Sequence, residues 1–220
     1  MISNRVVSFN YKARYACLGT LSPQTNNIVF VLHGYGQLAP YFLKKFQPVC
    51  NNRTYLVAPE GLSHFYLEDV TSRAQTGNTK VGASWMTREN RLMDIENYLS
   101  YLHTVYHTEV PAGYNGKVTV LGFSQGAATA SRWVCAGAHA HQLILWAGVF
   151  PPDLNLQDAS TTLARTEVKF VYGTKDPFVT EARLHEAEHL FGKLNLSPGR
   201  ITFEGGHELH TGTLTQLLAV

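Results

Sequence analysis

A serine between glycines is the first group in this sequence that could do covalent chemistry. Ser124 lies in GFSQG at positions 122–126, which matches the pattern GxSxG. An apolar run at 118–121 precedes this pattern and small residues at 127–130 follow it. Because glycine and alanine leave room where a strand crosses a helix, the pattern predicts a sharp strand-to-helix turn that presents Ser124 as a nucleophile. The alternative is a surface serine in a glycine-rich turn.

A serine hydroxyl needs a base to take its proton and an acid to orient that base. His207 follows two glycines just after the last apolar run, and Asp176 precedes a proline just beyond the run that ends at Tyr172. The chain order Ser124, Asp176, His207 is the nucleophile, acid and base order of α/β-hydrolases. Taken separately, Asp176 could belong to a simple turn and His207 could be structural. His210, inside the last predicted helix, is the alternative base.

Acyl transfer also requires donors for the negative charge that develops on the carbonyl oxygen. The N–H of Gln125 follows directly from the predicted turn. The second donor should come from a glycine-containing loop after an early strand, and HGYGQ at 33–37 is such a loop. We expect the Tyr35 N–H to be this donor, with Gly36 as the alternative. A phosphate-binding loop is the weaker interpretation, because Ala39 stands where a third glycine is needed.

A rival motif lies at 185–189, where HEAEH matches the HExxH pattern of zinc peptidases. Each helical residue advances by about 100°, so His185 and His189 point away from the apolar stripe of that helix. A zinc pair must instead face a cleft with a third ligand. We therefore predict no metal site, with a weak adventitious surface site as the alternative.

The composition is that of one folded enzyme-sized unit. The 220 residues are 45% hydrophobic and 15% charged with a formal charge of +2, which excludes disorder and offers no basic surface for nucleic acid. No apolar run reaches the length of a transmembrane segment, and the polar start lacks the core of a secretion signal. Three scattered cysteines, Cys17, Cys50 and Cys135, fit reduced thiols. We expect a cytoplasmic protein.

Short apolar runs alternate with helical patterns, which predicts an α/β fold with a largely parallel sheet. The predicted strands are 6–9, 14–18, 28–32, 55–58, 118–122, 143–146, 168–172 and 200–203. The predicted helices are 39–46, 87–106, 126–135, 180–194 and 209–218, with Thr87 capping the longest. Residues 1–220 should form one domain, in which 59–84 is a long loop bordering the active site.

The segments LHGYGQ, GFSQG, GTKDP and GGH occur in this order, so the sequence resembles the phospholipase/carboxylesterase family of α/β-hydrolases. This family includes acyl-protein thioesterases and small bacterial carboxylesterases. The resemblance spans nearly the whole chain and implies a cofactor-free serine hydrolase with the triad and oxyanion donors named above. It also implies a mostly parallel sheet with helices on both faces and no large lid domain. Two departures are Gln37, where the family usually has an acidic residue, and a longer 60–84 segment.

The predicted function is hydrolysis of a carboxylic ester or thioester through an acyl-serine. Five aromatic or apolar residues in loops near the catalytic edge are the candidate acyl pocket: Phe65, Tyr66, Trp85, Met86 and Phe178. The resemblance implies the pocket role of Trp85, for which core packing is the alternative. The partner is a small-molecule substrate, and an apolar patch at the pocket mouth could support a homodimer. Acyl transfer or perhydrolysis, and a non-catalytic binding protein of this fold, are the alternative functions.

Overall fold

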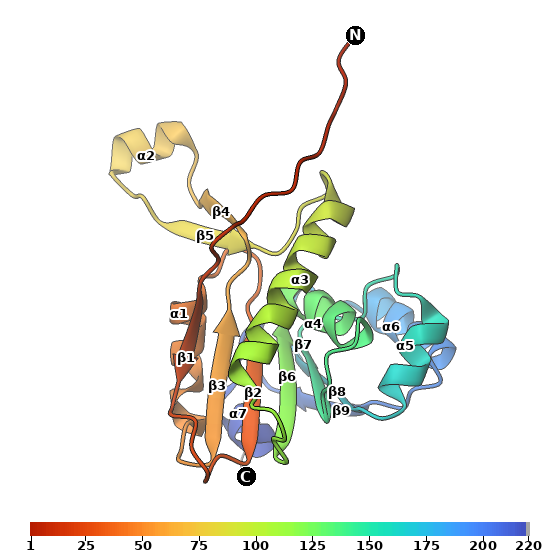
Figure 1. The fold of residues 1–220 in the computed structure, drawn as a ribbon. Helices are drawn as coiled ribbons and strands as arrows, with labels where there is room; N and C mark the ends of the chain where they lie inside the picture. The colour runs from red at the N-terminus through yellow and green to blue at the C-terminus, as the bar shows by residue number, and fades with distance from the viewer. Residues whose placement is uncertain (219–220) are drawn as a thin grey trace.

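A computed structural model describes residues 1–218 and has a central sheet of seven strands in the order β1-β3-β2-β6-β7-β8-β9 (Figure 1). These strands are β1 (Tyr15–Leu18), β2 (Asn27–Leu32), β3 (Thr54–Pro59), β6 (Lys117–Phe123), β7 (Gln142–Trp146), β8 (Glu167–Gly173) and β9 (Gly199–Phe203). Only β1 runs antiparallel to its neighbour, and the other pairs are parallel. The predicted α/β fold is confirmed.

Helices cover both faces of the sheet, which explains why β2, β3 and β7 are buried at every position. In β2, Ile28, Phe30 and Leu32 pack into one core, whereas Val29 and Val31 pack into the other. The first core contains residues of α3 (Arg91–Glu109), α4 (Gln125–Cys135), α5 (Leu156–Leu163) and α6 (Glu181–Lys193). The second contains residues of α1 (Ala39–Leu43), the 3₁₀ helix η1 (Lys44–Val49) and α7 (Thr211–Leu218).

The segment expected as a loop at 59–84 has regular structure. The strands β4 (Ser63–Tyr66) and β5 (Val81–Ser84) form an antiparallel pair, and α2 (Val70–Thr76) connects them. Asp69 caps α2 by accepting hydrogen bonds from two backbone amides, and Gly77 ends it with φ +69°. Figure 1 shows this excursion beyond the carboxyl ends of the sheet strands. Elements this short carry too few repeats for a periodic sequence pattern.

Two predictions at helix and strand starts are wrong. Residues 6–9 are not a strand, because residues 1–14 have no regular structure and the apolar side chains at 6, 7 and 9 are exposed. An extended segment without a neighbouring strand lacks the ladder that defines a sheet. The long helix begins at Arg91 rather than Thr87, because Asn90 adopts the left-handed conformation with φ +49°.

Besides α2, one other helix of the described residues was missed in the sequence analysis. Helix α5 has eight residues and begins after Asn155, whose side chain accepts hydrogen bonds from the amides of Gln157 and Asp158. The other predicted strands and helices occur, with ends that shift by one or two residues, except that η1 replaces the end of the first helix. Among the described residues, no helix combines the length and the apolar character needed to cross a membrane.

Candidate active site

Ser124 occupies a strained turn between β6 and α4. Its backbone has φ +55° and ψ −116°, a conformation that non-glycine residues rarely adopt. The Ser124 N–H donates to Trp146 O at 2.8 Å, which ties the turn to the end of β7. A Cβ atom on Gly122 would lie 2.2 Å from Gly126 O, and one on Gly126 would lie 2.2 Å from Leu32 O. Both glycines of the GxSxG pattern are therefore required by backbone packing.

Replacing Gly126 with alanine is expected to lower the free energy of unfolding by about 1–3 kcal/mol, because the new methyl group meets the β2 backbone. Urea unfolding followed by circular dichroism measures this. The matched control is Gly192→Ala in α6, where an added Cβ meets nothing within 4 Å. That variant should be unchanged or more stable by about 0.5–1 kcal/mol. Equal stability of the two variants would show that the turn is not tightly packed.

Asp176 and His207 form a hydrogen-bonded pair at the carboxyl ends of β8 and β9. The distance from His207 Nδ1 to Asp176 Oδ2 is 2.7 Å, and the Asp176 side chain is completely buried. The other carboxylate oxygen accepts the Phe178 N–H at 2.8 Å, which fixes the carboxylate orientation. The loop that carries Asp176 is joined to the loop that carries His207 by a hydrogen bond of 2.9 Å from Lys175 N–H to Gly205 O. A carboxylate oxygen that accepts a hydrogen bond from Nδ1 keeps the proton on that nitrogen and leaves Nε2 free to act as the base.

Aromatic rings hold His207 next to the Ser124 turn. The ring centroid of Phe123, the residue before Ser124, lies 4.9 Å from that of His207. On another side, the Phe178 ring lies 4.8 Å away in an edge-to-face arrangement. Because the carboxyl ends of β6, β8 and β9 share one sheet edge, the fold brings the three candidate triad residues to the same edge.

The loop at 33–37 lies beside the Ser124 turn, since β2 and β6 are neighbours with Leu32 opposite Gly122. Here the strand order reverses direction, which is where α/β sheets bind ligands. Gly36 N–H donates to Ala83 O at 2.9 Å, so the alternative oxyanion donor is engaged elsewhere. Among residues 1–218, no group accepts a hydrogen bond from Tyr35 N–H. Gln125 N–H is at the first position of α4, where amides have no partner within the helix.

Gln37 stabilises this loop from within. Its Oε1 accepts the Gly34 N–H at 2.8 Å, and its own backbone N–H donates to Gly34 O at 3.3 Å. A neutral carboxamide can therefore supply an acceptor oxygen at the position where the resembled family has an acidic residue.

His33 and Glu60 support the loop and were missed in the sequence analysis. Gly61 N–H donates to His33 Nε2 at 2.9 Å, so the His33 proton is on Nδ1, 2.8 Å from Gly34 O. Burial lowers the pKa of His33, which keeps the ring neutral.

Glu60 Oε2 accepts the Ala39 N–H at 2.8 Å. Burial favours protonation of Glu60, but hydrogen bonds from His64, Arg14 and Ala39 outweigh it and lower its pKa. His33 lies in the HGYGQ segment, but no pattern indicated that its ring accepts the Gly61 N–H, and Glu60 belongs to no recognisable motif.

The five candidate pocket residues do not share one surface. Phe65 stacks on Tyr35 with ring centroids 5.0 Å apart, and Phe178 is exposed beside His207. Trp85 is buried in the core, as the core-packing alternative supposed, and Met86 is partly buried against the same core. Tyr66 packs under Arg73, whose guanidinium carbon lies 3.8 Å from the ring centroid. Because neighbouring strand residues point to opposite sides, Phe65 and Tyr66 face different surfaces.

His210, the alternative base, and the HEAEH motif at 185–189 have other surroundings than the candidate triad. His210 Nδ1 accepts the Thr213 N–H at 3.3 Å and its ring stacks on Phe203, so His210 caps α7. His185 and His189 are exposed on α6, as the helical geometry predicted. Within residues 1–218, no three His, Cys, Asp or Glu side chains are grouped so that they could hold a metal ion.

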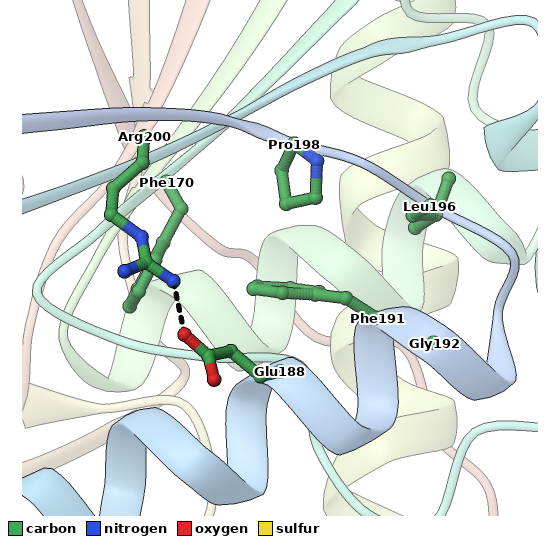
Figure 2. A pocket seen from close by; sticks show the side chains of 7 residues that line it. All are labelled: Phe170, Glu188, Phe191, Gly192, Leu196, Pro198 and Arg200. Carbon is green, nitrogen blue, oxygen red and sulfur yellow. Dashed lines mark hydrogen bonds and ion pairs between the residues drawn. The ribbon is translucent and has the colours of Figure 1, made fainter.

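A cavity of about 280 Å³ lies between α6 and the segment that leads into β9 (Figure 2). Glu188 and Arg200 form an ion pair of 2.5 Å across it. The remaining lining residues are Phe170, Phe191, Gly192, Leu196 and Pro198. Arg200 is near the start of β9, so the cavity is remote from the carboxyl edge that carries the candidate triad.

Solved structures with the same fold include several hydrolases. Acyl-protein thioesterase 2 of Zea mays superposes with a TM-score of 0.70 at 14% identity, over 94% of this chain and 96% of that one. Esterase PE8 has a TM-score of 0.66 at 19% identity, over 95% and 97% of the two chains. A phospholipase/carboxylesterase of Dyadobacter fermentans has a TM-score of 0.60 at 19% identity, over 96% of each chain. At these identities the likeness concerns the fold.

The family relationship comes from the sequence. No curated protein matches the chain. The family described as Serine hydrolase (FSH1) matches residues 23–211, which include the whole sheet except β1 and all the candidate triad residues. The resemblance to the phospholipase/carboxylesterase family of α/β-hydrolases is confirmed by the serine hydrolase family match and by the esterase, thioesterase and phospholipase/carboxylesterase structures of the same fold. The chain belongs to the serine hydrolase (FSH1) family.

Proposed function

We propose that this serine hydrolase cleaves carboxylic esters or thioesters through an acyl intermediate on Ser124. The observation that carries the proposal is the 2.7 Å pair of Asp176 and His207 beside the strained turn at Ser124. A buried acid that orients an imidazole next to a partly exposed turn serine is the arrangement that activates a hydroxyl for acyl transfer. The hydrolase structures that share this fold support the same class of reaction.

In the acylation half, Ser124 Oγ bonds to the carbonyl carbon as His207 Nε2 takes the hydroxyl proton. The carbonyl oxygen becomes an oxyanion, which accepts hydrogen bonds from Tyr35 N–H and Gln125 N–H. When the carbonyl re-forms, the bond to the alcohol or thiol breaks, and His207 gives its proton to that leaving group. Asp176 keeps its hydrogen bond to Nδ1 and stabilises the transient imidazolium.

In the deacylation half, His207 takes a proton from water as the water oxygen bonds to the acyl carbon. The same two amides hold the second oxyanion. Collapse of this intermediate breaks the bond to Ser124 Oγ, which regains the proton from His207. The products are a carboxylic acid and the free enzyme, so the cycle consumes one water and requires no cofactor.

Two aromatic contacts support an apolar acyl site. Phe65 stacks on Tyr35, and Phe178 packs against His207, so each ring lies next to a residue of the proposed catalytic machinery. The excursion β4-α2-β5 borders this approach, since β5 is hydrogen-bonded to the loop at 33–37. We propose that the substrate carries a short or medium acyl chain or a small aromatic acyl group, because aromatic side chains pack well around compact apolar groups.

Hydrolysis of p-nitrophenyl acetate, butyrate, octanoate and palmitate, with EDTA present, tests this function. We expect metal-independent turnover whose kcat/KM falls about tenfold or more from butyrate to palmitate, because a compact pocket cannot enclose the longer chain. A thioester series of the same acyl groups compares the two leaving groups. Loss of activity on adding EDTA alone, or no turnover of any substrate in either series, would contradict the proposal.

A further inference from the structure

The carboxamide of Gln125 is bound to the backbone of residues 84–86. Its Oε1 accepts the Trp85 N–H at 3.2 Å, and its Nε2 donates to Met86 O at 2.9 Å. Nε2 also lies 3.2 Å from Ser84 Oγ. A carboxamide turned the other way would place two donors or two acceptors face to face, so these contacts define its orientation. Gln125 therefore binds this segment through one donor and one acceptor, which is the pairing that a backbone peptide group of a neighbouring strand makes.

The same segment is bound on its other side to the loop at 33–37. Trp85 Nε1–H donates to His33 O at 2.8 Å, and the two rings stack with centroids 5.0 Å apart. One residue before this segment, Ala83 O accepts Gly36 N–H at 2.9 Å and Ala83 N–H donates to Gln37 O at 3.2 Å. Residues 83–86 thus connect the turn at Ser124 to the loop that carries Tyr35.

We propose that the Gln125 side chain is a positioning residue that sets the distance between the two oxyanion donors, by linking the Ser124 turn to the loop at 33–37 through residues 84–86. The inference rests on the proposed function. The two donors, Gln125 N–H and Tyr35 N–H, belong to different elements, and each must come within about 3 Å of the same oxygen. A connection between the elements keeps both amides in place before the substrate binds.

Burial makes this connection specific. Ser84 and Trp85 are each 1% exposed, so water has little access to the Trp85 N–H that Gln125 satisfies. An apolar side chain at 125 would leave the Trp85 N–H without a partner, and Met86 O would keep only the hydrogen bond from the Ser84 hydroxyl, at 2.8 Å. An unpaired buried N–H moves to find another acceptor. Because Trp85 also holds His33, a shift of this segment displaces the loop that carries Tyr35.

The first test is Gln125→Met, which keeps the backbone N–H and the side-chain length but removes both hydrogen bonds. We expect kcat for p-nitrophenyl butyrate to fall about 10- to 100-fold with KM within about threefold, because donors are misplaced in the transition state. A trifluoromethyl ketone adds to the serine hydroxyl and forms an adduct that carries an oxyanion. Its Ki should rise by the same factor as kcat/KM falls.

The matched control is Gln142→Met, since Gln142, at the start of β7, is a buried residue whose carboxamide is hydrogen-bonded to Glu167. Its kcat should be unchanged.

The second test is Gln125→Glu, read as activity relative to wild type at each pH. The carboxylate keeps the acceptor for Trp85 N–H but faces Met86 O without a proton. Protonation supplies the missing donor, so the relative activity should rise as the pH falls from 8 to 5. Taking the ratio to wild type cancels any pH dependence that the variant shares with wild type, and the relative activity of Gln125→Met should stay constant with pH.

A third variant, Trp85→Phe, retains a stacked ring but removes the hydrogen bond to His33 O. It should lose kcat as Gln125→Met does, and it tests the connection if a Gln125 variant does not fold. Suppose that wild type is active and that a fluorophosphonate labels Ser124. If Gln125→Met or a folded Trp85→Phe then keeps the kcat of Gln142→Met, the positioning role is wrong but the proposed function stands. If Ser124 is neither labelled nor required for turnover, both the function and this inference are wrong.

Discussion

Replacing Ser124 with alanine is expected to reduce kcat/KM for p-nitrophenyl butyrate by about 10⁴- to 10⁶-fold. Without the hydroxyl there is no group to form the acyl intermediate, and the remaining amides stabilise only direct attack by water. The measurement is steady-state hydrolysis, together with mass spectrometry after treatment with a fluorophosphonate. Wild type should gain one phosphonyl group on Ser124, and the variant should gain none.

A serine of the following helix provides the matched control for this variant. Ser131 is buried in α4, where its hydroxyl donates to Ala127 O at 2.8 Å, and it lies outside the candidate site. Ser131→Ala should keep kcat/KM within about twofold and remain labelled. If Ser124→Ala hydrolyses the ester as fast as Ser131→Ala does, another group is the nucleophile and the assignment of Ser124 fails.

The second large effect is expected for Asp176→Asn, which should reduce kcat/KM by about 10⁴-fold. An asparagine oxygen can still accept the Phe178 N–H, but its amide then presents a donor to His207 Nδ1. A donor at this position favours the tautomer with the proton on Nε2, which cannot take the proton of Ser124. The geometry is retained while the basic nitrogen is lost, so kcat should fall much more than KM changes.

Asp69→Asn is the control for the loss of a carboxylate. Asp69 caps α2 away from the triad, and asparagine caps helices equally well. That variant should keep wild-type kinetics, and both variants should unfold at urea concentrations close to that of wild type. An activity of Asp176→Asn within about tenfold of wild type would mean that the pair with His207 is structural.

The sequence by itself determined the sheet, the serine turn and the chain order of the candidate triad. The apolar run 28–32 must be covered on both faces, so it predicts a buried strand of a parallel sheet. The GFSQG pattern can be recognised from neighbouring residues alone, because the tight backbone turn at Ser124 requires glycine at positions 122 and 126. The exposure of His185 and His189 follows equally from helical geometry alone.

Only the tertiary structure decided which groups support the candidate site. His33, Glu60 and the side chain of Gln125 act through backbone groups that are 28, 21 and about 40 residues away in the sequence. No local pattern encodes such pairs. The start at Arg91 depends on the left-handed Asn90, and the segment 6–9 is not a strand because no other strand lies beside it. Local backbone preferences can be predicted from neighbouring residues, whereas contacts between distant segments exist only once the chain has packed.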